Sequence, residues 1–323
     1  MEHSNQTAID EYLLEHIVTD NDIYAEFFIP FVLIRLSPTG KDDNIAKLSI
    51  RLHNIGSSGS RKRMLHLSWR KLNLPIDPLP IQPKVITELA ACGIACVLVP
   101  LYADLRVLFT AQEGDRFDYW VGDDERLWGL EVSGTIDEDL HTRHRAKIGQ
   151  LLKNPFGVSG YVAVTKFSTR ESIFSFHRYR KENQMIPSQN DSISRQGLSD
   201  RYKQNEKETS RLILEANLLK SSGRRKEAAQ KFAQAADLEM KNCDELLALG
   251  LLDLYYIRCF SAASCLAQAG NLYQAVQICE ELLDNSGLPS LLRQRIAGYL
   301  GVMETRVDQW MTSYAPDAVA AAD

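Results

Sequence analysis

The sequence has little net charge and no long apolar run. The first gives no overall positive charge for binding nucleic acid, and the second argues against a membrane-spanning protein. Its 323 residues carry 37 Lys and Arg against 42 Asp and Glu, a formal net charge of -5. A contact with a polyanion such as nucleic acid must therefore use a local basic face. The chain has no run of about 18 or more apolar residues, so we predict no membrane span.

Targeting signals and cysteine motifs are also missing. The amino-terminal stretch MEHSNQTAIDEYLLEH lacks the basic segment and the apolar core of a secretory signal, so we expect a cytoplasmic protein with no membrane partner. The six cysteines form no CxxC pair and have no histidines at zinc-binding spacing. We interpret them as buried free thiols.

The length and composition predict two globular domains. With 45% hydrophobic and 24% charged residues, the chain has the composition of a soluble globular protein and enough residues for two cores. We predict an α/β domain at 1–178 with a β-rich amino-terminal extension. A polar stretch at 179–210 has few apolar residues and predicts a linker. A helical domain at 211–315 completes the chain.

The amino-terminal extension contains one helix-like and three strand-like patterns. Residues 8–16 predict a short amphipathic helix, and AEFFIPFVLIRLS, IAKLSIRLHNIG and RMLHLSWRKL predict strands. The loop SSGSRKR carries Arg61, Lys62 and Arg63, which either contact a phosphate or form a solvated loop. Four prolines between Leu74 and Pro83 predict an extended connector.

Two strand-like runs on either side of the turn GDDE predict a β-hairpin with an acid on each strand. If the loop has four residues, Asp118 lies opposite Gly129 and Arg116 opposite Glu131. The two carboxylates then lie diagonally on one face, about 7–8 Å apart at Cα, where a metal ion could bridge them. A register shift of one residue would place them on opposite faces.

Further elements are predicted around this hairpin. A helix at 84–96 and a short strand at 106–111 precede it, and strands at 160–167 and 172–177 end the region. Thr135 and Glu138 match a capping box at the start of a helix over 137–153. This helix carries Arg143, Lys147 and Gln150 on one polar face.

This order of elements, over about residues 84–176, resembles the PD-(D/E)XK nuclease superfamily. Asp118 matches the first acid, and Glu131-Val132-Ser133 takes the place of the Glu-x-Lys motif. The resemblance implies a restriction-endonuclease-like mixed sheet with flanking helices, and phosphodiester hydrolysis of DNA or RNA. It also implies one or two Mg²⁺ (or Mn²⁺) ions held by Asp118, Glu131 and the Val132 carbonyl, with Glu88 as an extra acidic ligand.

Position 133 departs from the family pattern, because Ser133 replaces the lysine that would orient the nucleophile. Related domains supply this group from the following helix, where Lys147 and Arg143 lie one turn apart and could steady the scissile phosphate. The alternative is a helix with a solvated basic face. The nearby HTRHR sequence has no evident third ligand for zinc.

The carboxyl-terminal half predicts helical hairpins. ANLLKSSGRRKEAAQKFAQAADLE and SCLAQAGNLYQAVQICEELLD align Gly223 with Gly270 and Ala228 with Ala275, and they resemble tetratricopeptide repeats, although the offset of 47 exceeds the usual period of about 34. Such repeats bind a protein partner, whereas a plain bundle would support the first domain or self-associate. The apolar segment 246–260 predicts one central buried helix.

Two functional hypotheses follow from these patterns. The first is a Mg²⁺-dependent nuclease, for which a setting in prokaryotic genome defence would be suitable by analogy. The second is a non-catalytic adaptor with a degenerate nuclease fold, whose helical-repeat domain binds a partner protein. Retention of Asp118 and Glu131 favours the enzyme, and Ser133 favours the adaptor.

Overall fold

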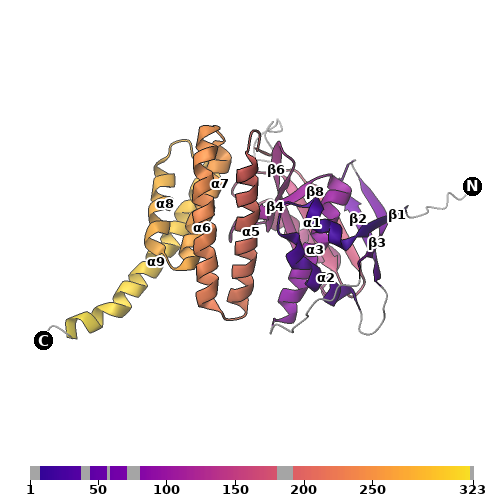
Figure 1. Ribbon diagram of the computed structural model, residues 1–323, viewed down its shortest axis with the longest axis horizontal. Coiled ribbons are helices and arrows are strands. Elements are labelled where there is room, and N and C mark those ends of the chain that lie inside the picture. Colours follow the sequence, from indigo (N-terminus) through magenta and orange to yellow (C-terminus); the bar gives the residue numbers. More distant parts are fainter. Residues whose placement is uncertain (1–7, 38–43, 57–58, 71–80, 180–191, 321–323) are drawn as a thin grey trace, which may run out of the picture. The chain divides into compact units, whose positions relative to one another are not determined.

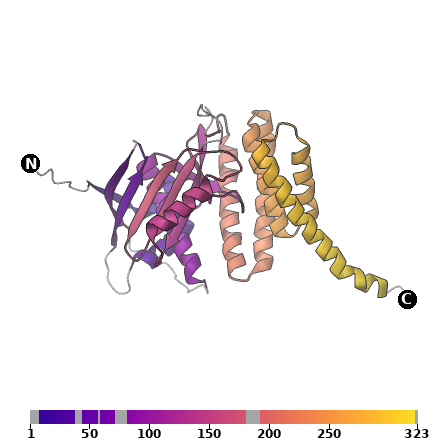
Figure 2. The same ribbon diagram turned by 180° about the vertical axis from the view of Figure 1, so that it is seen from behind.

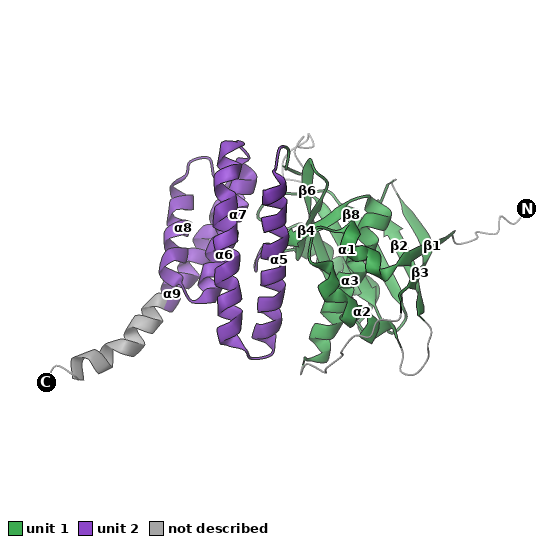
Figure 3. Ribbon diagram, viewed as in Figure 1, with its two compact units in different colours: residues 1–111, 115–196 green, residues 112–114, 197–323 purple. Residues whose placement is uncertain are grey.

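The computed structural model describes residues 8–37, 44–56, 59–70, 81–179 and 192–320, with side chains as far as Arg306. It divides into two compact units (Figure 3): unit 1 comprises 1–111 and 115–196, and unit 2 comprises 112–114 and 197–323. Unit 1 is mixed α/β and unit 2 is helical. The predicted combination of an α/β part with an all-α part is therefore confirmed.

Unit 1 is built on a mixed β-sheet. Its strands are β1 (Ala8–Leu13), β2 (Ile45–His53), β3 (Ser60–Ser68), β4 (Arg106–Thr110), β5 (Tyr119–Gly122), β6 (Arg126–Thr135), β7 (Gly160–Lys166), β8 (Glu171–His177) and β9 (Ile193–Ser194). Its helices are η1 (Leu14–His16), α1 (Ile17–Asp20), η2 (Ala25–Phe28), α2 (Ile29–Leu36), α3 (Pro83–Ala103) and α4 (Leu140–Leu151).

The sheet order is β1-β3-β2-β8-β7-β6-β5-β4, with β9 beside β6. Strands β4, β5 and β6 are antiparallel neighbours, whereas β6 and β7 are parallel and are joined through α4. Helix α3 lies on one face of this sheet (Figure 1) and α4 on the other (Figure 2). All of β5 and nearly all of β6 are buried, because helices cover both faces.

Helix α3 is the one described helix that is long and apolar enough to cross a membrane by length and composition. Its most apolar window is 56% buried inside the protein, and residues 93–99 are buried without interruption. The buried apolar surface is thus accounted for by packing in unit 1, which is consistent with a soluble protein.

Two predictions for the amino-terminal extension are wrong. Residues 8–13 form strand β1, which pairs in parallel with β3, because the edge of β3 offers unpaired backbone groups. Residues 25–36 form η2 and α2 instead of a strand. Their apolar run is buried on most sides, and such a run does not distinguish helix from strand by periodicity.

The predicted linker is wrong where the structure describes it. Residues 193–194 form strand β9, and Asp200–Ser221 forms helix α5. Ser199 caps α5 by accepting a hydrogen bond from the Tyr202 amide at 3.1 Å. The middle of the predicted linker, 180–191, and most of the predicted proline connector, 71–80, lie outside the described residues.

Unit 2 confirms the predicted helical hairpins. It contains α5, α6 (Arg225–Ala248), α7 (Leu252–Ala269), α8 (Leu272–Asp284) and α9 (Ser290–Ala320), and each helix packs on the next. The turns at Gly223 and Gly270 have φ of +81° and +92°, a region that favours glycine. The single helix predicted over 246–260 is wrong, because Gly250, at φ +70°, separates α6 from α7.

Candidate functional site

The β5–β6 hairpin places the two predicted acids directly opposite each other. Trp120 pairs with Gly129, so the same register brings Asp118 opposite Glu131. This is a shift of two residues from the predicted pairing, and a shift of two keeps both acids on one face. The cause is Asp123, whose Oδ1 accepts hydrogen bonds from two turn amides at 2.8 and 2.7 Å and fixes the turn one residue later than predicted.

Asp118 lies just before β5 and is bonded to β6 through its side chain. Its Oδ2 accepts a hydrogen bond from the Val132 amide at 2.7 Å, and its own amide donates to the Leu130 carbonyl at 2.9 Å. The residue is exposed, although protein atoms surround its carboxylate. The Asp118 carboxylate therefore has a fixed position at the accessible side of the site.

Glu131 lies on β6, opposite Asp118, and is fully buried. Its Oε1 accepts a hydrogen bond from Lys147 Nζ, which reaches it from α4. Its Oε2 has no hydrogen-bond donor among the described residues. A proton held between the Glu131 and Asp118 carboxyls would satisfy this oxygen, and so would a bound cation.

The environment favours protonation of this pair. Burial and the charge of Asp118 both raise the pKa of Glu131, Lys147 lowers it, and the net result is a pKa of about 9. Burial also raises the pKa of Asp118, while the Val132 amide and Lys147 act in the opposite direction. Two adjacent carboxylates with one ammonium group leave an excess negative charge, so the pair binds a proton or a cation readily.

Helix α4 brings two basic side chains to the same place. Lys147 also donates to Gln150 Oε1 at 3.1 Å. Arg143 lies one turn earlier and donates from Nε to Ser133 Oγ at 2.7 Å and from Nη1 to Glu138 Oε2 at 2.6 Å. The Lys147 and Arg143 side chains are 22% and 20% exposed, so both reach solvent at the rim of the site.

The start of α4 differs from the predicted capping box. Asp139 is the N-cap and accepts from the Thr142 amide at 2.7 Å, and this contact lowers the pKa of Asp139. Thr135 Oγ1 does accept a bond from the Glu138 amide at 3.0 Å. Glu138 does not reach back to a backbone amide, because its carboxylate is paired with Arg143.

Helix α3 approaches the opposite face of β6 at Gly134. A Cβ at this position would lie 2.3 Å from the Thr87 carbonyl oxygen, so only glycine permits the contact. The next residue, Glu88, is half-buried and raises the pKa of Asp118 through its charge. Glu88 is thus close enough to influence Asp118, and no contact with Glu131 is found for it among the described residues.

The predicted basic loop does not join this site. Arg61, Lys62 and Arg63 lie in strand β3, paired with β2, so the predicted loop assignment is wrong. Four strand spacings separate β3 from β6, about 19 Å across the sheet. Arg63 also forms an ion pair with Asp10, which gives it a structural partner.

The HTRHR sequence belongs to a separate histidine cluster. The Nε2 atoms of His144 and His177 contact Ser175 Oγ at 2.7 and 2.8 Å, and burial lowers the pKa of both histidines to about 4. His141 contacts Arg51 at 2.8 Å. Hydrogen bonds to Ser175 and Arg51 thus orient the three rings.

Among the described residues, Asp118 and Glu131 are the acidic side chains that lie together at the main site. The described residues contain no group of three or more His, Cys, Asp or Glu side chains with metal-binding geometry. Asp118 and Glu131 supply two carboxylates, one with a buried oxygen that lacks a donor. Mg²⁺ suits such a pair, because it keeps several waters and binds through one or two carboxylates.

The structure brings together Asp118, Glu131, Lys147 and Arg143, which the sequence analysis had grouped as site candidates, but the contacts of Asp123 and Gly134 were not predicted. Asp123 was visible as turn chemistry, whereas the contact of Gly134 with α3 has no signal in the local sequence. Comparison of the chain with protein-family models gave no match, and comparisons with curated proteins and with solved structures gave none either.

Proposed function

We propose that this chain is a metal-dependent nuclease that hydrolyses phosphodiester bonds of DNA or RNA in the cytoplasm. The observation that carries the proposal is the contact of Lys147 with Glu131 beside Asp118. Three residues that are dispersed along the chain thereby supply two carboxylates and one ammonium group at a single place. A structural ion pair alone would not require a second, accessible carboxylate next to a buried one.

The order of elements supports a PD-(D/E)XK-like core. Helix α3 is followed by the antiparallel strands β4, β5 and β6, then by α4, and then by β7, which is parallel to β6. This is the helix, hairpin, helix and strand order of the family. In this proposal Lys147 of α4 replaces the motif lysine, whose position is taken by Ser133.

Asp118 and Glu131 would hold Mg²⁺ or Mn²⁺, with the Val132 carbonyl as a third ligand and Glu88 as an outer charge. The chemistry that such an ion supplies when bound is activation of a water and neutralisation of charge on the leaving oxygen. Glu131 gives up its proton when the cation binds, so binding should strengthen as the pH rises. The Val132 amide fixes the orientation of Asp118.

The two basic side chains would bind and orient the scissile phosphate. Lys147 neutralises Glu131 and is held from its other side by Gln150, so its ammonium group is fixed at the site. Arg143 is positioned by Ser133 and Glu138. Because Ser133 Oγ accepts from Arg143, the serine at the motif position has an orienting role.

We assign unit 2 the role of binding a protein partner or a second copy of the chain through tetratricopeptide-like hairpins. The packing of the helices beside the two glycine turns supports this role. Small residues are buried there: Ala216 and Ala228 in the first hairpin, and Ala263 and Ala275 in the second. Small residues at these positions allow helices to approach closely. The adaptor hypothesis assigns this role to the whole protein.

The test is a cleavage assay on single- and double-stranded DNA and RNA, with Mg²⁺, with Mn²⁺ and with chelator. We expect cleavage that depends on the metal and is lost in Asp118→Asn and Glu131→Gln, both of which keep the side-chain shape. The exposed turn variant Glu125→Gln is the matched control and should retain activity. Cleavage that persists in both site variants would refute the site assignment. Absence of cleavage on all four substrates, with no metal-induced stabilisation, would favour the adaptor.

A further inference from the structure

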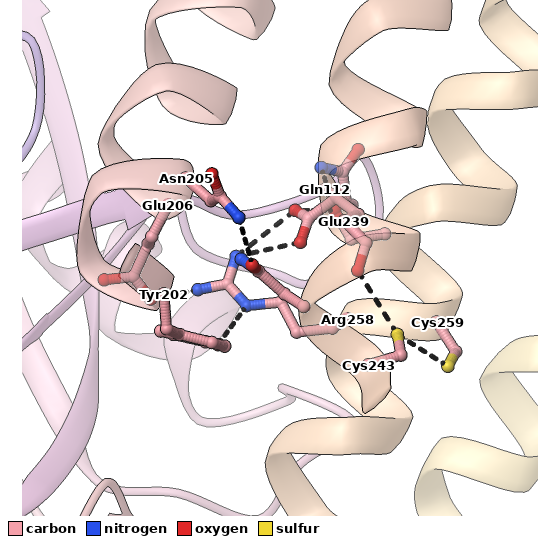
Figure 4. Close-up of polar contacts among 10 residues, drawn as sticks. Gln112, Tyr202, Asn205, Glu206, Glu239, Cys243, Arg258 and Cys259 are labelled. Atoms are coloured by element: carbon pink, nitrogen blue, oxygen red, sulfur yellow. Dashed lines mark hydrogen bonds and ion pairs between the residues drawn. The ribbon is translucent and has the colours of Figure 1, made fainter. Parts of the chain in front are cut away.

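Two cysteines of unit 2 contact each other in its interior. Cys243 of α6 and Cys259 of α7 have their sulfur atoms 3.1 Å apart (Figure 4), and each is 4% exposed. Cys243 also donates to the Glu239 carbonyl at 3.3 Å. All six cysteines of the chain are free thiols in this structure.

The helical hairpin explains why these two residues meet. Helices α6 and α7 are joined by a tight turn around residue 251, and Cys243 and Cys259 are equally far from that residue along the chain. Positions at equal distances from the turn lie at the same height on two antiparallel helices, here about 12 Å from the turn. The contact therefore follows from the fold and does not depend on a flexible segment.

We propose that Cys243 and Cys259 are a redox-active pair that forms a reversible disulfide between α6 and α7. A disulfide bond is about 2.05 Å long, so the sulfurs need to approach by only about 1 Å. This inference goes beyond the proposed nuclease activity and does not depend on it.

The oxidant is a peroxide, and the steps balance. One thiol loses its proton and attacks a peroxide oxygen of H₂O₂; the O–O bond breaks, the leaving hydroxide takes up the proton, and a sulfenic acid and one water form. The second thiol attacks this sulfur; the S–S bond forms, the S–O bond breaks and a second water leaves. A thiol reductant reverses the reaction by exchange.

The surroundings slow the reactions of the pair. The hydrogen bond with Cys259 and burial both raise the pKa of Cys243, so little thiolate is present at neutral pH, and peroxide and thiol reagents alike should react slowly with it in the folded chain. The pair lies next to the buried Arg258, which bonds Glu239, Glu206 and Tyr202 (Figure 4). A cross-link at this place would hold α6 and α7 together beside that ion network.

Cys265 and Cys279 offer a matched control within the chain. They lie on either side of the turn between α7 and α8, Cys265 five residues before Gly270 and Cys279 nine residues after it, and both are buried. No sulfur–sulfur contact is found for them in the part of the chain that the structure describes. Selective oxidation of the first pair would thus reflect the 3.1 Å contact and not burial in a hairpin alone.

The experiment is peptide mapping of the full folded chain after treatment with H₂O₂, followed by unfolding and alkylation of the remaining thiols. We expect four alkylated cysteines and one linked peptide pair containing Cys243 and Cys259, which a reductant restores to six alkylated cysteines. Cys243→Ser and Cys259→Ser should each abolish the linked peptide, whereas Cys265→Ser should retain it.

Six alkylated cysteines after oxidation of the folded chain would overturn the proposal. So would a linked peptide that contains Cys265 or Cys279, or one that joins two molecules only. If a serine variant does not fold, the map of the unchanged chain still decides between these outcomes. Nuclease assays play no part in the test, so its failure is separate from failure of the proposed function.

Discussion

Replacing Glu131 with glutamine should change how the stability of unit 1 depends on pH in the absence of metal. The carboxyl has an ordinary pKa of 4.5, and burial beside Asp118 raises it to about 9 in the folded protein. Between these values the folded state holds a proton that the unfolded state releases. The stability supplied by that proton is therefore lost as the pH rises through this window.

The magnitude follows from proton linkage. One proton held only by the folded state changes the free energy of unfolding by about 1.4 kcal/mol for each pH unit. Asp118 shares the titration with Glu131, and the charge of Lys147 opposes the rise in pKa of both acids, so we expect the wild type to lose about 1–2 kcal/mol more than Glu131→Gln between about pH 6.5 and pH 8. The glutamine keeps an acceptor for Lys147 and cannot ionise.

The assay is a urea titration in the presence of a chelator, in which tryptophan fluorescence reports the unfolding. Trp69, Trp120 and Trp128, three of the four tryptophans, belong to unit 1, so the signal reports mainly on the unit that contains the site. Glu125→Gln, on the exposed hairpin turn, should follow the wild-type pH dependence. Equal slopes for the wild type and Glu131→Gln would refute the shared, raised titration of the acid pair.

Three further predictions concern metal binding and packing. Mn²⁺ at ten times its Kd should stabilise the wild type by about 1.4 kcal/mol and leave the midpoint of Asp118→Asn unchanged, as thermal unfolding would show. Gly134→Ala should destabilise unit 1 by about 2 kcal/mol or more, because its Cβ would meet the backbone of α3 at 2.3 Å. Gly149→Ala, which has open space, should be neutral or stabilising in the same urea titration. Arg258→Met leaves two buried carboxylates unpaired and should cost about 3–5 kcal/mol in unit 2, measured by circular dichroism; an unchanged midpoint would contradict the buried network.

The sequence was sufficient to predict the hairpin and its acids because both are local. Alternating residues on either side of a turn identify two strands, and two carboxylates an odd number of residues apart share a face of the hairpin when its loop has an even number of residues. The exact pairing was missed by two residues because Asp123 uses its side chain to cap the turn. A shift of two residues leaves Asp118 and Glu131 on the same face of the hairpin, so the prediction that they lie together still holds.

The position of Lys147 was predictable only in part. Helical spacing places it one turn after Arg143, but its contact with Glu131 arises because α4 crosses back over the sheet between β6 and β7. This crossing is a non-local feature of the chain. The resemblance to a nuclease core suggested it, and local periodicity did not.

Buried polar residues explain the mistaken linker. The start of α5 contains Glu206 and Thr209, which are charged or polar and nonetheless buried. The partner of Glu206 is Arg258, 52 residues later, so the local pattern gives no reason to expect burial. A hydrophobicity pattern detects helices that bury apolar faces, and this helix buries an ion pair as well.

The most direct test of the central claim asks whether Lys147 has taken over the role of the missing motif lysine. Single-turnover cleavage with Mg²⁺ would be compared in the wild type, Lys147→Ala, the double variant Lys147→Ala with Ser133→Lys, and Lys153→Ala as an exposed lysine control. The account predicts a loss of about 100-fold in Lys147→Ala, partial recovery in the double variant and no change in Lys153→Ala. Cleavage by Lys147→Ala at the wild-type rate would contradict it.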